Sequence, residues 1–161
     1  MDTLKRILLA EDDPKDVELT LSALAEYHLI NDVVVVRDWV EALDYVHRRG
    51  CFAERPVGFP AVILLDLKMP RLDGLQVLRQ LKADEQLSLI PIVVLTSSRE
   101  DRDLNECYQL GVNAYVVKPV HFADFVEAIR RLGVFWALIN EPPPGSGPVS
   151  PRPALHGKRK E

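Results

Sequence analysis

The sequence predicts an α/β domain in which a parallel β-sheet is covered by helices on both faces. Short apolar segments alternate five times with segments whose apolar residues recur at helical spacing. The apolar segments show no polar alternation, which is typical of strands buried on both faces of a parallel sheet. A chain that alternates strands and helices in this way forms right-handed crossovers, and these place helices on both faces of the sheet.

The five short apolar segments are the expected strands. Val33 to Val36 are four consecutive valines, and β-branched side chains favour strands. The first apolar segment, from Ile7 to Ala10, ends directly before acidic residues, as expected where a chain leaves a buried sheet. The strands are expected at residues 7–10, 33–36, 61–65, 92–95 and 114–117.

Each expected strand is followed by a segment with helical spacing. Pro14 opens the first of these, because proline in the first turn of a helix removes no intrahelical hydrogen bond. The last carries Phe125, Ile129 and Leu132 at helical intervals. The helices are expected at residues 14–27, 39–50, around 77–81, 100–110 and 122–139.

The chain has the length of one domain with an additional C-terminal segment. Its 161 residues suffice for one hydrophobic core, which we expect in residues 1–140. Residues 141–161 contain six prolines and carry basic residues at 158–160, so we expect a disordered or extended tail. Residues 50–60 hold two prolines and two glycines and are interpreted as an exposed connection, either a contact loop or a tolerated insertion.

Charge and hydropathy exclude several classes of protein. The formal net charge of −4 gives no support for non-specific nucleic-acid binding, which needs a basic face. No apolar run approaches the roughly 18 residues of a membrane span, and the N-terminus does not resemble a signal peptide. We therefore expect a cytoplasmic protein. Cys51 and Cys107 have no partner at a metal-binding spacing and are expected to be reduced thiols.

Residues capable of chemistry follow four of the five expected strands. In an open parallel sheet, ligands bind beyond the carboxyl ends of the strands. The second strand is followed by Arg37 and Asp38, to which the sequence assigns no role. The other strand ends are followed by Glu11, Asp12 and Asp13, by Asp66, by Thr96, Ser97 and Ser98, and by Lys118 and Pro119.

The acidic residues at these strand ends indicate a metal site. Carboxylates held a few ångströms apart repel one another unless some are protonated or a cation lies between them. Hard oxygen ligands that leave the coordination sphere partly open suit Mg²⁺, which phosphate oxygens usually complete. An acidic pocket that also contains a hydroxyl group and a lysine is therefore suited to a phosphoryl group.

Each of these residues alone has an ordinary structural interpretation. A threonine at a strand end can belong to a turn, and Lys118 can simply be a surface lysine. Acidic residues before Pro14 can favour the start of a helix through its dipole. These interpretations do not explain why the residues coincide at successive strand ends.

The motifs resemble those of the receiver domain of bacterial two-component response regulators over nearly all of residues 5–139. Residues 66–74, DLKMPRLDG, look like the phosphorylation-site loop of that family. Thr96 follows Asp66 by 30 residues (96 − 66), and Lys118 follows it by 52 (118 − 66). The resemblance implies a flavodoxin-like, doubly wound (βα)5 fold with a five-stranded parallel sheet in the order 2-1-3-4-5.

The resemblance also implies a role for each acidic residue. Asp66 would be the phosphoacceptor and would attack a phosphohistidine on a partner histidine kinase. Asp13 would contribute only to the electrostatics of the pocket. The Mg²⁺ ligands would be Asp66, Asp12 directly, Glu11 through water, and the backbone carbonyl of Lys68.

The resemblance implies roles for further residues as well. Thr96 would donate its hydroxyl to the phosphoryl group and move inward, while Lys118 would pair with the phosphate and with Asp66. A cis peptide bond would join Lys118 to Pro119. Tyr115 matches the switch aromatic of the family, whose rotamer follows the threonine, so phosphorylation would be read out on the face of helix four, strand five and helix five.

Two features are similar to those of a narrower group, the single-domain regulators that partner phytochrome histidine kinases. One is the long connection at 50–60, and the other is a final helix that carries Phe135 and Trp136 before the proline-rich end. Exposed, these rings would suit a homodimer through the face of helix four, strand five and helix five. Alternatively, both rings pack on the sheet. No output domain is expected to follow, so the protein would receive phosphate, pass it on or drain it, and bind a partner.

Two other functions remain as alternatives to a phosphoacceptor switch that turns over no external substrate. A receiver-like adaptor would bind partners without phosphate, and loss of Asp12, Thr96 or Lys118 would be its expected mark. A haloacid-type phosphatase needs a second aspartate two residues after its nucleophile, where Lys68 stands. Lys68 and Ser98 also occupy the two positions that tune phosphate lifetime in the family, and we expect Lys68 to hinder the attacking water.

Overall fold

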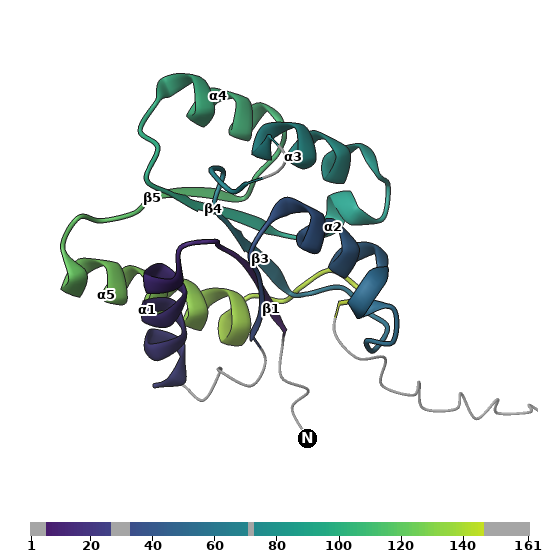
Figure 1. The fold of residues 1–161 in the computed structure, drawn as a ribbon, viewed down its shortest axis with the longest axis horizontal. Helices are drawn as coiled ribbons and strands as arrows, with labels where there is room; N and C mark the ends of the chain where they lie inside the picture. Colours follow the sequence, from purple (N-terminus) through teal and green to yellow (C-terminus); the bar gives the residue numbers. More distant parts are fainter. Residues whose placement is uncertain (1–5, 27–32, 71–72, 147–161) are drawn as a thin grey trace, which may run out of the picture.

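The computed structural model describes residues 6–26, 33–70 and 73–146. These residues form three layers, with a parallel sheet between two layers of helices (Figure 1). The strands are β1 (Ile7–Ala10), β2 (Val33–Val36), β3 (Val62–Leu65), β4 (Ile92–Thr96) and β5 (Ala114–Val117). Their spatial order is β2-β1-β3-β4-β5, and every neighbouring pair is parallel. The predicted fold class and strand order are confirmed.

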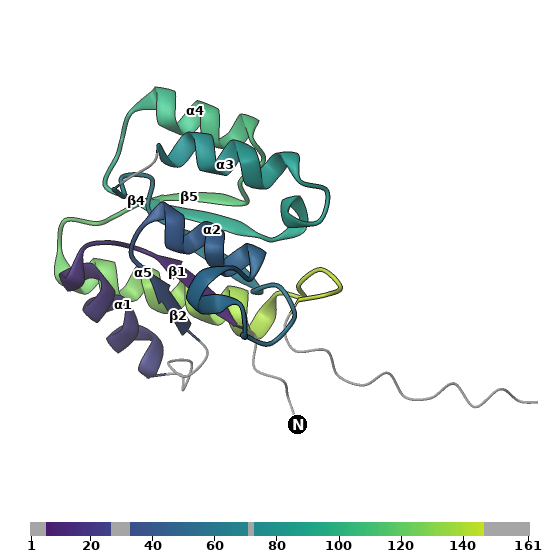
Figure 2. The ribbon, with the colours of Figure 1, turned by 45° about the vertical axis from the view of Figure 1, so that its right-hand side comes forward.

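The helices divide between the two faces of the sheet, as Figures 1 and 2 show from two directions. In β1, Ile7 and Leu9 belong to the core cluster that contains buried residues of α1 and α5. Leu8 and Ala10 belong to the cluster on the opposite face, which contains residues of α2, α3 and α4. The helices are α1 (Pro14–Ala25), α2 (Trp39–His47), α3 (Gly74–Ala83), α4 (Asp101–Gln109) and α5 (Phe122–Gly133).

Aspartate side chains cap the first two helices. The Asp13 carboxylate accepts a hydrogen bond from the Lys15 backbone N–H at 2.9 Å, so Asp13 is the N-cap of α1. Asp38 accepts from the Glu41 N–H at 2.8 Å, and the Glu41 carboxylate accepts from the Arg37 N–H at 2.9 Å. Asp38 is therefore the N-cap of α2, and Glu41 bonds to the residue before the cap. Capping gives Asp38 a structural role that the sequence did not show.

Three helices bear on the predicted helix ends. Tyr27, the expected end of the first helix, lies outside the described residues. The helix α2 ends at His47 rather than near Gly50, because Arg48 adopts a left-handed backbone conformation with φ of 54°. After α5, the chain continues from Val134 to Ile139 as a π-helix, here called η4. The helical stretch thus reaches Ile139 as expected, but its last part is wound more widely.

The connection at 50–60 has a defined conformation that one arginine holds. It contains the short 3-10 helix η2 (Gly50–Phe52). The Arg55 Nε donates to the Tyr45 carbonyl at 2.7 Å, and the guanidinium lies 4.3 Å from the centroid of the Tyr45 ring. Arg55 Nη1 also donates to the carbonyl of Gly58 at 2.9 Å. Both interpretations of this connection, contact loop and tolerated insertion, stay predictions.

Part of the predicted C-terminal tail lies against this connection. The Phe59 N–H donates to the Gly145 carbonyl at 3.0 Å, and a parallel β-bridge joins Phe59 to Ser146. The prediction of a tail beginning at residue 141 did not anticipate these contacts. For residues 147–161, which lie outside the described residues, disorder stays a prediction.

Candidate functional site

The register of the sheet brings the predicted site residues to one edge. The ladder of hydrogen bonds continues one residue beyond the strands: the Asp66 N–H donates to Ala10 at 3.0 Å, and the Lys118 N–H donates to Thr96 at 2.8 Å. Glu11, the residue after β1, follows the same pattern through Val36 at 3.0 Å. Because parallel strands end at the same edge, residues far apart in the chain become neighbours there.

Three carboxylates form an acidic cluster at this edge. Oxygen atoms of Glu11, Asp12 and Asp66 lie within 4.8 Å of one another. Glu11 and Asp66 are buried, at 2% and 7% exposed, whereas Asp12 is exposed. Hard oxygen donors in this arrangement, open to solvent on one side, suit a divalent cation that keeps water or phosphate ligands. The residues present therefore fit the metal site that the sequence predicts.

The ammonium group of Lys118 lies among three carboxylates. Its Nζ donates to Glu11 Oε2 at 2.6 Å, to Asp16 Oδ2 at 2.7 Å and to Asp66 Oδ2 at 3.1 Å. The predicted pairing of Lys118 with Asp66 is present. Asp16 was missed by sequence reasoning, because an acid in the first turn of a helix is explained equally well by the helix dipole.

The charges of the site shift the pKa values of two of its groups. The pKa of Glu11 is raised to about 7, mainly by burial and also by the negative charge of Asp66, against the lowering effect of the Lys118 hydrogen bond. Burial by itself lowers the pKa of Lys118. Hydrogen bonds to Asp16 and Glu11 and the charge of Asp66 outweigh burial, so the Lys118 pKa is raised and the ammonium stays charged.

Backbone N–H groups of Lys68 and Asp13 hold the carboxylates of Asp66 and Glu11. The Lys68 backbone N–H donates to Asp66 Oδ1 at 3.1 Å, and the Lys68 side chain is exposed. The role of the Lys68 carbonyl as a metal ligand stays a prediction. Asp13 donates its backbone N–H to Glu11 Oε1 at 3.1 Å, so this residue fixes the Glu11 carboxylate as well as capping α1.

Thr96 and Tyr115, the predicted switch pair, both bond to the backbone of Ser98. Thr96 is completely buried, and its hydroxyl oxygen accepts from the Ser98 N–H at 3.3 Å. The Tyr115 hydroxyl donates to the Ser98 carbonyl at 3.0 Å. The Ser98 hydroxyl donates to Asp103 on α4 at 2.5 Å. The predicted pair is thus joined through one residue and attached to α4, but a change of rotamer stays a prediction.

The predicted cis peptide bond between Lys118 and Pro119 is wrong for this structure. No peptide bond in the described part of the chain is cis. The trans form is the more stable one for X–Pro bonds, by roughly 0.5–1 kcal/mol. Lys118 reaches all three carboxylates from a trans bond, so these contacts do not require the cis isomer.

The two aromatic residues expected at a dimer face have different surroundings. Trp136 is only 9% exposed and packs in the core cluster with Ile129, so its expected place on an exposed face is wrong. It lies on the inward side of the helical segment, where a large apolar ring gains most from burial. Phe135 is 46% exposed, and its ring contacts Trp136 edge to face at 5.0 Å between centroids.

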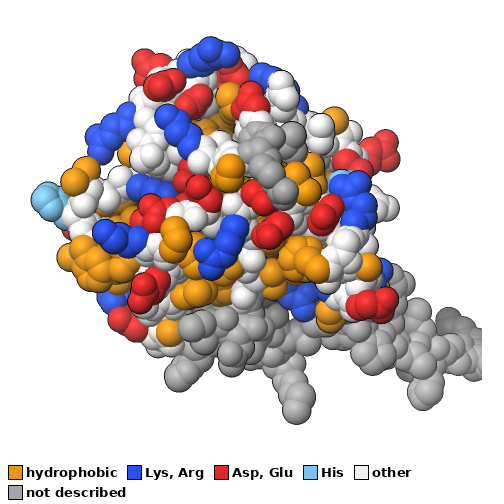
Figure 3. All heavy atoms as spheres, viewed as in Figure 1, with side chains coloured by type: hydrophobic (Ala, Val, Ile, Leu, Met, Phe, Trp, Pro, Cys, Tyr) orange, Lys and Arg blue, Asp and Glu red, His pale blue; other side chains and the backbone are white. Residues whose placement is uncertain are grey.

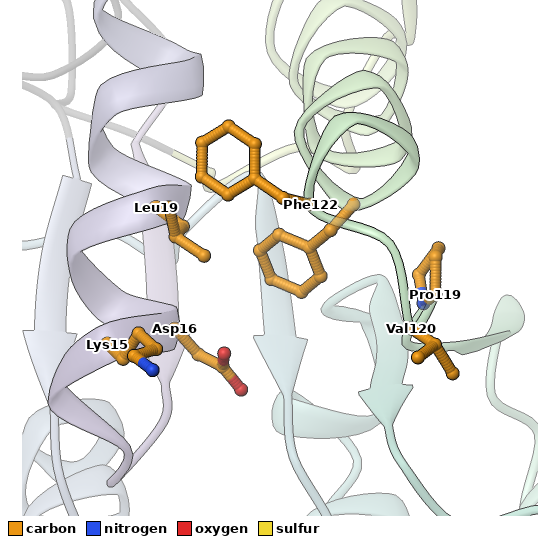
Figure 4. A pocket seen from close by; sticks show the side chains of 7 residues that line it. Lys15, Asp16, Leu19, Pro119, Val120 and Phe122 are labelled. Carbon is orange, nitrogen blue, oxygen red and sulfur yellow. The ribbon is translucent and has the colours of Figure 1, made fainter.

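A cavity of about 420 Å³ lies beside the site, between α1 and the start of α5 (Figure 4). At its border, Val120 is 86% exposed and Phe122 is 65% exposed, and Figure 3 shows hydrophobic side chains at the surface around the start of α5. The sequence did not indicate these residues, because the turn at Pro119 does not show which of the following side chains will be exposed. The cavity is lined by Lys15, Asp16, Leu19, Pro119, Val120, Phe122 and Phe125.

The sheet order, the acidic cluster and the lysine define a response regulator receiver domain. The model of that family, described as the response regulator receiver domain, matches residues 7–130, and the chain belongs to this family. Receiver domains are phosphoacceptor switches of two-component signalling. The acidic cluster is a divalent metal site of the kind typical of them. Among the described residues, no helix is both long and apolar enough to cross a membrane.

Several relatives of this chain are regulators associated with phytochromes. Bacteriophytochrome response regulator RtBRR is 60% identical, with a TM-score of 0.69 over 89% of this chain and 86% of that chain. The phosphorylated cyanobacterial phytochrome response regulator RcpA is 36% identical, with a TM-score of 0.81 over 87% of this chain and 99% of that chain. Response regulator Rcp1 of Synechocystis is 33% identical over 132 residues, which are 82% of this chain and 88% of Rcp1. Its Mn²⁺-bound structure matches with a TM-score of 0.78, at 31% identity, over 86% of this chain and 99% of that chain.

Proposed function

We propose that this chain accepts a phosphoryl group on Asp66 from a phosphohistidine of a partner histidine kinase, in a reaction that requires Mg²⁺. One observation supports this most directly. The buried Asp66 carboxylate lies 3.1 Å from the Lys118 ammonium and within a cluster of oxygens that can hold a cation. A phosphoryl group on Asp66 would meet positive charge from both sides.

The transfer forms one bond and breaks one. An Asp66 carboxylate oxygen attacks the phosphorus atom, the P–N bond to the histidine breaks, and its electron pair stays on the imidazole nitrogen. Lys118 neutralises charge on the transferred group, and the Lys68 N–H orients the carboxylate by its hydrogen bond to Oδ1. Bound Mg²⁺ would supply further neutralisation of the non-bridging phosphoryl oxygens. Asp12, Glu11, Asp66 and the Lys68 carbonyl would hold it.

The partner is a histidine kinase of the bacteriophytochrome class, working in the cytoplasm. The 60% identity to a bacteriophytochrome response regulator supports this class of kinase. The exposed Val120 and Phe122 border the cavity into which Asp16 projects in Figure 4, and Asp16 contacts the Lys118 ammonium. Apolar groups so close to the acceptor suit a kinase helix that carries the phosphohistidine. A labelled phosphoryl group on such a kinase should pass to the wild-type chain and not to the Asp66→Asn variant.

The output is a change of partner rather than turnover of an external substrate. Phosphorylation would draw Thr96 inward and move Tyr115 through their shared bonds to Ser98. A homodimer through α4, β5 and α5 would carry this output. Phe135 and Ile139, which are 46% and 66% exposed after α5, would be its apolar contacts.

Incubation with phosphoramidate and Mg²⁺ tests the proposed acceptor. We expect the mass of the intact chain to increase by one phosphoryl group, and we expect no increase for Asp66→Asn or in the presence of a chelator. Asp124→Asn is the matched control, because Asp124 is exposed on α5 and lies outside the acidic cluster. A wild-type chain that gains no phosphoryl group, or an Asp66→Asn chain that gains one, would overturn the proposal.

A further inference from the structure

The three hydrogen-bond donors of the Lys118 ammonium are all in use. A lysine ammonium has three N–H donors, and here they meet Glu11 at 2.6 Å, Asp16 at 2.7 Å and Asp66 at 3.1 Å. Of these three acceptors, Asp16 alone lies outside the acidic cluster that could hold a metal ion. The contact between Lys118 and Asp16 is therefore the one that a bound cation or a phosphoryl group leaves free.

Both partners of this contact are held in place by their own elements. Asp16 lies in the first turn of α1, and the Asp13 cap accepts its backbone N–H at 3.4 Å. Lys118 directly follows β5 and donates its backbone N–H to Thr96 at 2.8 Å. The Lys118 side chain is 10% exposed and that of Asp16 is 23% exposed. Figure 4 shows the Asp16 carboxylate projecting from α1 into the space before α5.

We propose that Asp16 is a positioning residue that holds the Lys118 ammonium beside Asp66 when the other two acceptors are engaged elsewhere. This inference rests on the proposed phosphoacceptor function. A cation bound to the oxygens of Glu11 and Asp66, or a phosphoryl group on Asp66, would compete with Lys118 for these two carboxylates. The hydrogen bonds from Lys118 to both residues would then be weakened. Without Asp16, a flexible four-carbon side chain would be free to turn its ammonium toward solvent.

If Asp16 instead competed with the phosphoryl group for Lys118, the effect of its removal on the phosphorylation rate would be reversed. As a competitor, Asp16 would draw Lys118 away from the phosphoryl group, and its removal would speed phosphorylation. The 3.1 Å contact to Asp66, maintained together with the 2.7 Å contact to Asp16, favours positioning. One ammonium position satisfies both carboxylates, so the two contacts support each other.

Nitrogen NMR of the lysine ammonium groups tests the contact without any phosphoryl donor. We expect a slowly exchanging Lys118 ammonium signal in the wild-type chain, assigned by its absence in Lys118→Arg, that persists when Mg²⁺ is added. In Asp16→Asn we expect this signal to broaden or vanish when Mg²⁺ is added. Asp16→Glu should restore it in part. Absence of a protected signal in the wild-type chain, or its persistence in Asp16→Asn with Mg²⁺, would overturn the proposal.

Phosphorylation rates provide the second measurement. Loss of one charge-assisted hydrogen bond should slow phosphorylation of Asp16→Asn by phosphoramidate about tenfold. Glu18→Gln, which removes an exposed charge from the same helix, should keep the wild-type rate and the Lys118 signal. An unchanged or faster rate in Asp16→Asn would contradict positioning. A wild-type chain that takes up no phosphate would refute the proposed function instead, because the NMR measurement uses no phosphoryl donor.

Discussion

At the scale of single residues, the site is an acidic cluster that one lysine only partly neutralises. Glu11, Asp12 and Asp66 carry three carboxylates, and Asp16 adds a fourth near the same ammonium. The raised pKa of Glu11 shows that the buried carboxylate is not fully compensated. A divalent cation would reduce this cost, so metal binding and protonation of Glu11 should compete at this edge of the sheet.

The raised pKa of Glu11 makes a prediction about stability and pH. The pKa is 4.5 in a model compound and about 7 in the folded protein, so between these values the folded chain holds a proton that the unfolded chain releases. The free energy of unfolding of the metal-free chain, relative to Glu11→Gln, should therefore be highest below about 4.5 and fall by about 1–3 kcal/mol as the pH rises to about 7. Urea unfolding in chelator measures it. Parallel pH profiles for the two chains would contradict the prediction.

Lys68 carries a prediction about the lifetime of the phosphorylated state. Its backbone N–H bonds to Asp66 at 3.1 Å, while its side chain is exposed beside the acceptor. A long cationic side chain there can cover the path of the attacking water. Lys68→Asn should therefore shorten the lifetime of the phosphoryl group severalfold, measured as loss of the mass adduct after removal of the donor. Arg79→Asn, on the exposed surface of α3, is the control, and equal lifetimes for Lys68→Asn and the wild type would refute the idea.

Some residues of the site could be predicted from the sequence, and others could not. Asp66 and Lys118 directly follow strands and Thr96 ends one, so the rule that parallel strands end at one edge suffices to bring them together. Asp16 lies on a helix, and its contact with Lys118 joins residues 102 positions apart. Neither strand ends nor helical spacing indicates which side chains make contact across such a separation in sequence.

At the scale of secondary-structure elements, the loop after β3 and the start of α3 are packed too closely for any side chain at Gly74. A Cβ atom there would lie 2.4 Å from the Leu67 carbonyl oxygen and 2.8 Å from Cζ2 of Trp39. Asp73 caps α3 at the same point by accepting from the Leu75 N–H at 3.0 Å. The phosphorylation-site loop is thus held against the buried Trp39 ring.

Gly74→Ala should destabilise the fold and disturb the acceptor. Relief of this overlap requires a shift of backbone or of Trp39, which should cost about 1–3 kcal/mol in the free energy of unfolding. Because the shifted segment carries Asp66, phosphorylation by phosphoramidate should also slow. Urea unfolding and intact mass measure the two effects. Gln76→Ala, exposed on the same turn, should change neither, and a Gly74→Ala chain of wild-type stability would disprove this packing argument.

The strands were predictable to within one residue, whereas the helix ends were not. Strand prediction rests on buried apolar runs that the parallel sheet demands. Helix ends depend on single backbone conformations: Arg48 ends α2 by adopting a positive φ that is usual for glycine rather than arginine. The contact of Phe59 with Gly145 likewise depends on where Arg55 holds the connection, and no periodic pattern reports it.

At the scale of the whole molecule, the site and the proposed dimer face are joined by a short chain of contacts. Thr96 and Tyr115 meet at the Ser98 backbone, and the Ser98 hydroxyl reaches Asp103 on α4. A movement of Thr96 toward a phosphoryl group would break its bond with Ser98 and alter the attachment of α4. The state of Asp66 can therefore bias the surface formed by α4, β5 and α5.

The homodimer prediction places Phe135 at the contact between two copies. Phe135 and Ile139 line a hollow of about 230 Å³ together with Arg130 and Arg131. A two-fold interface sets the same patch on both copies, so the exposed ring of each could fill the hollow of the other. Phe135→Asp should weaken dimerisation by at least about tenfold, as for an aromatic contact near the centre of an interface. Sedimentation equilibrium before and after phosphorylation measures the change.

The matched control for this substitution is Leu89→Asp. Leu89 is 60% exposed, comparable with Phe135, but it lies in the 3-10 helix η3 (Leu87–Leu89) and does not line the hollow that Phe135 and Ile139 border. Trp136 is unsuitable as a probe, because its buried ring packs in the core and its loss would destabilise the fold. Equal weakening of dimerisation by Leu89→Asp and Phe135→Asp would show that the interface does not lie on this face. A wild-type chain that stays monomeric at tens of micromolar, with and without phosphate, would exclude the homodimer, because an interface of ordinary size should associate in that range.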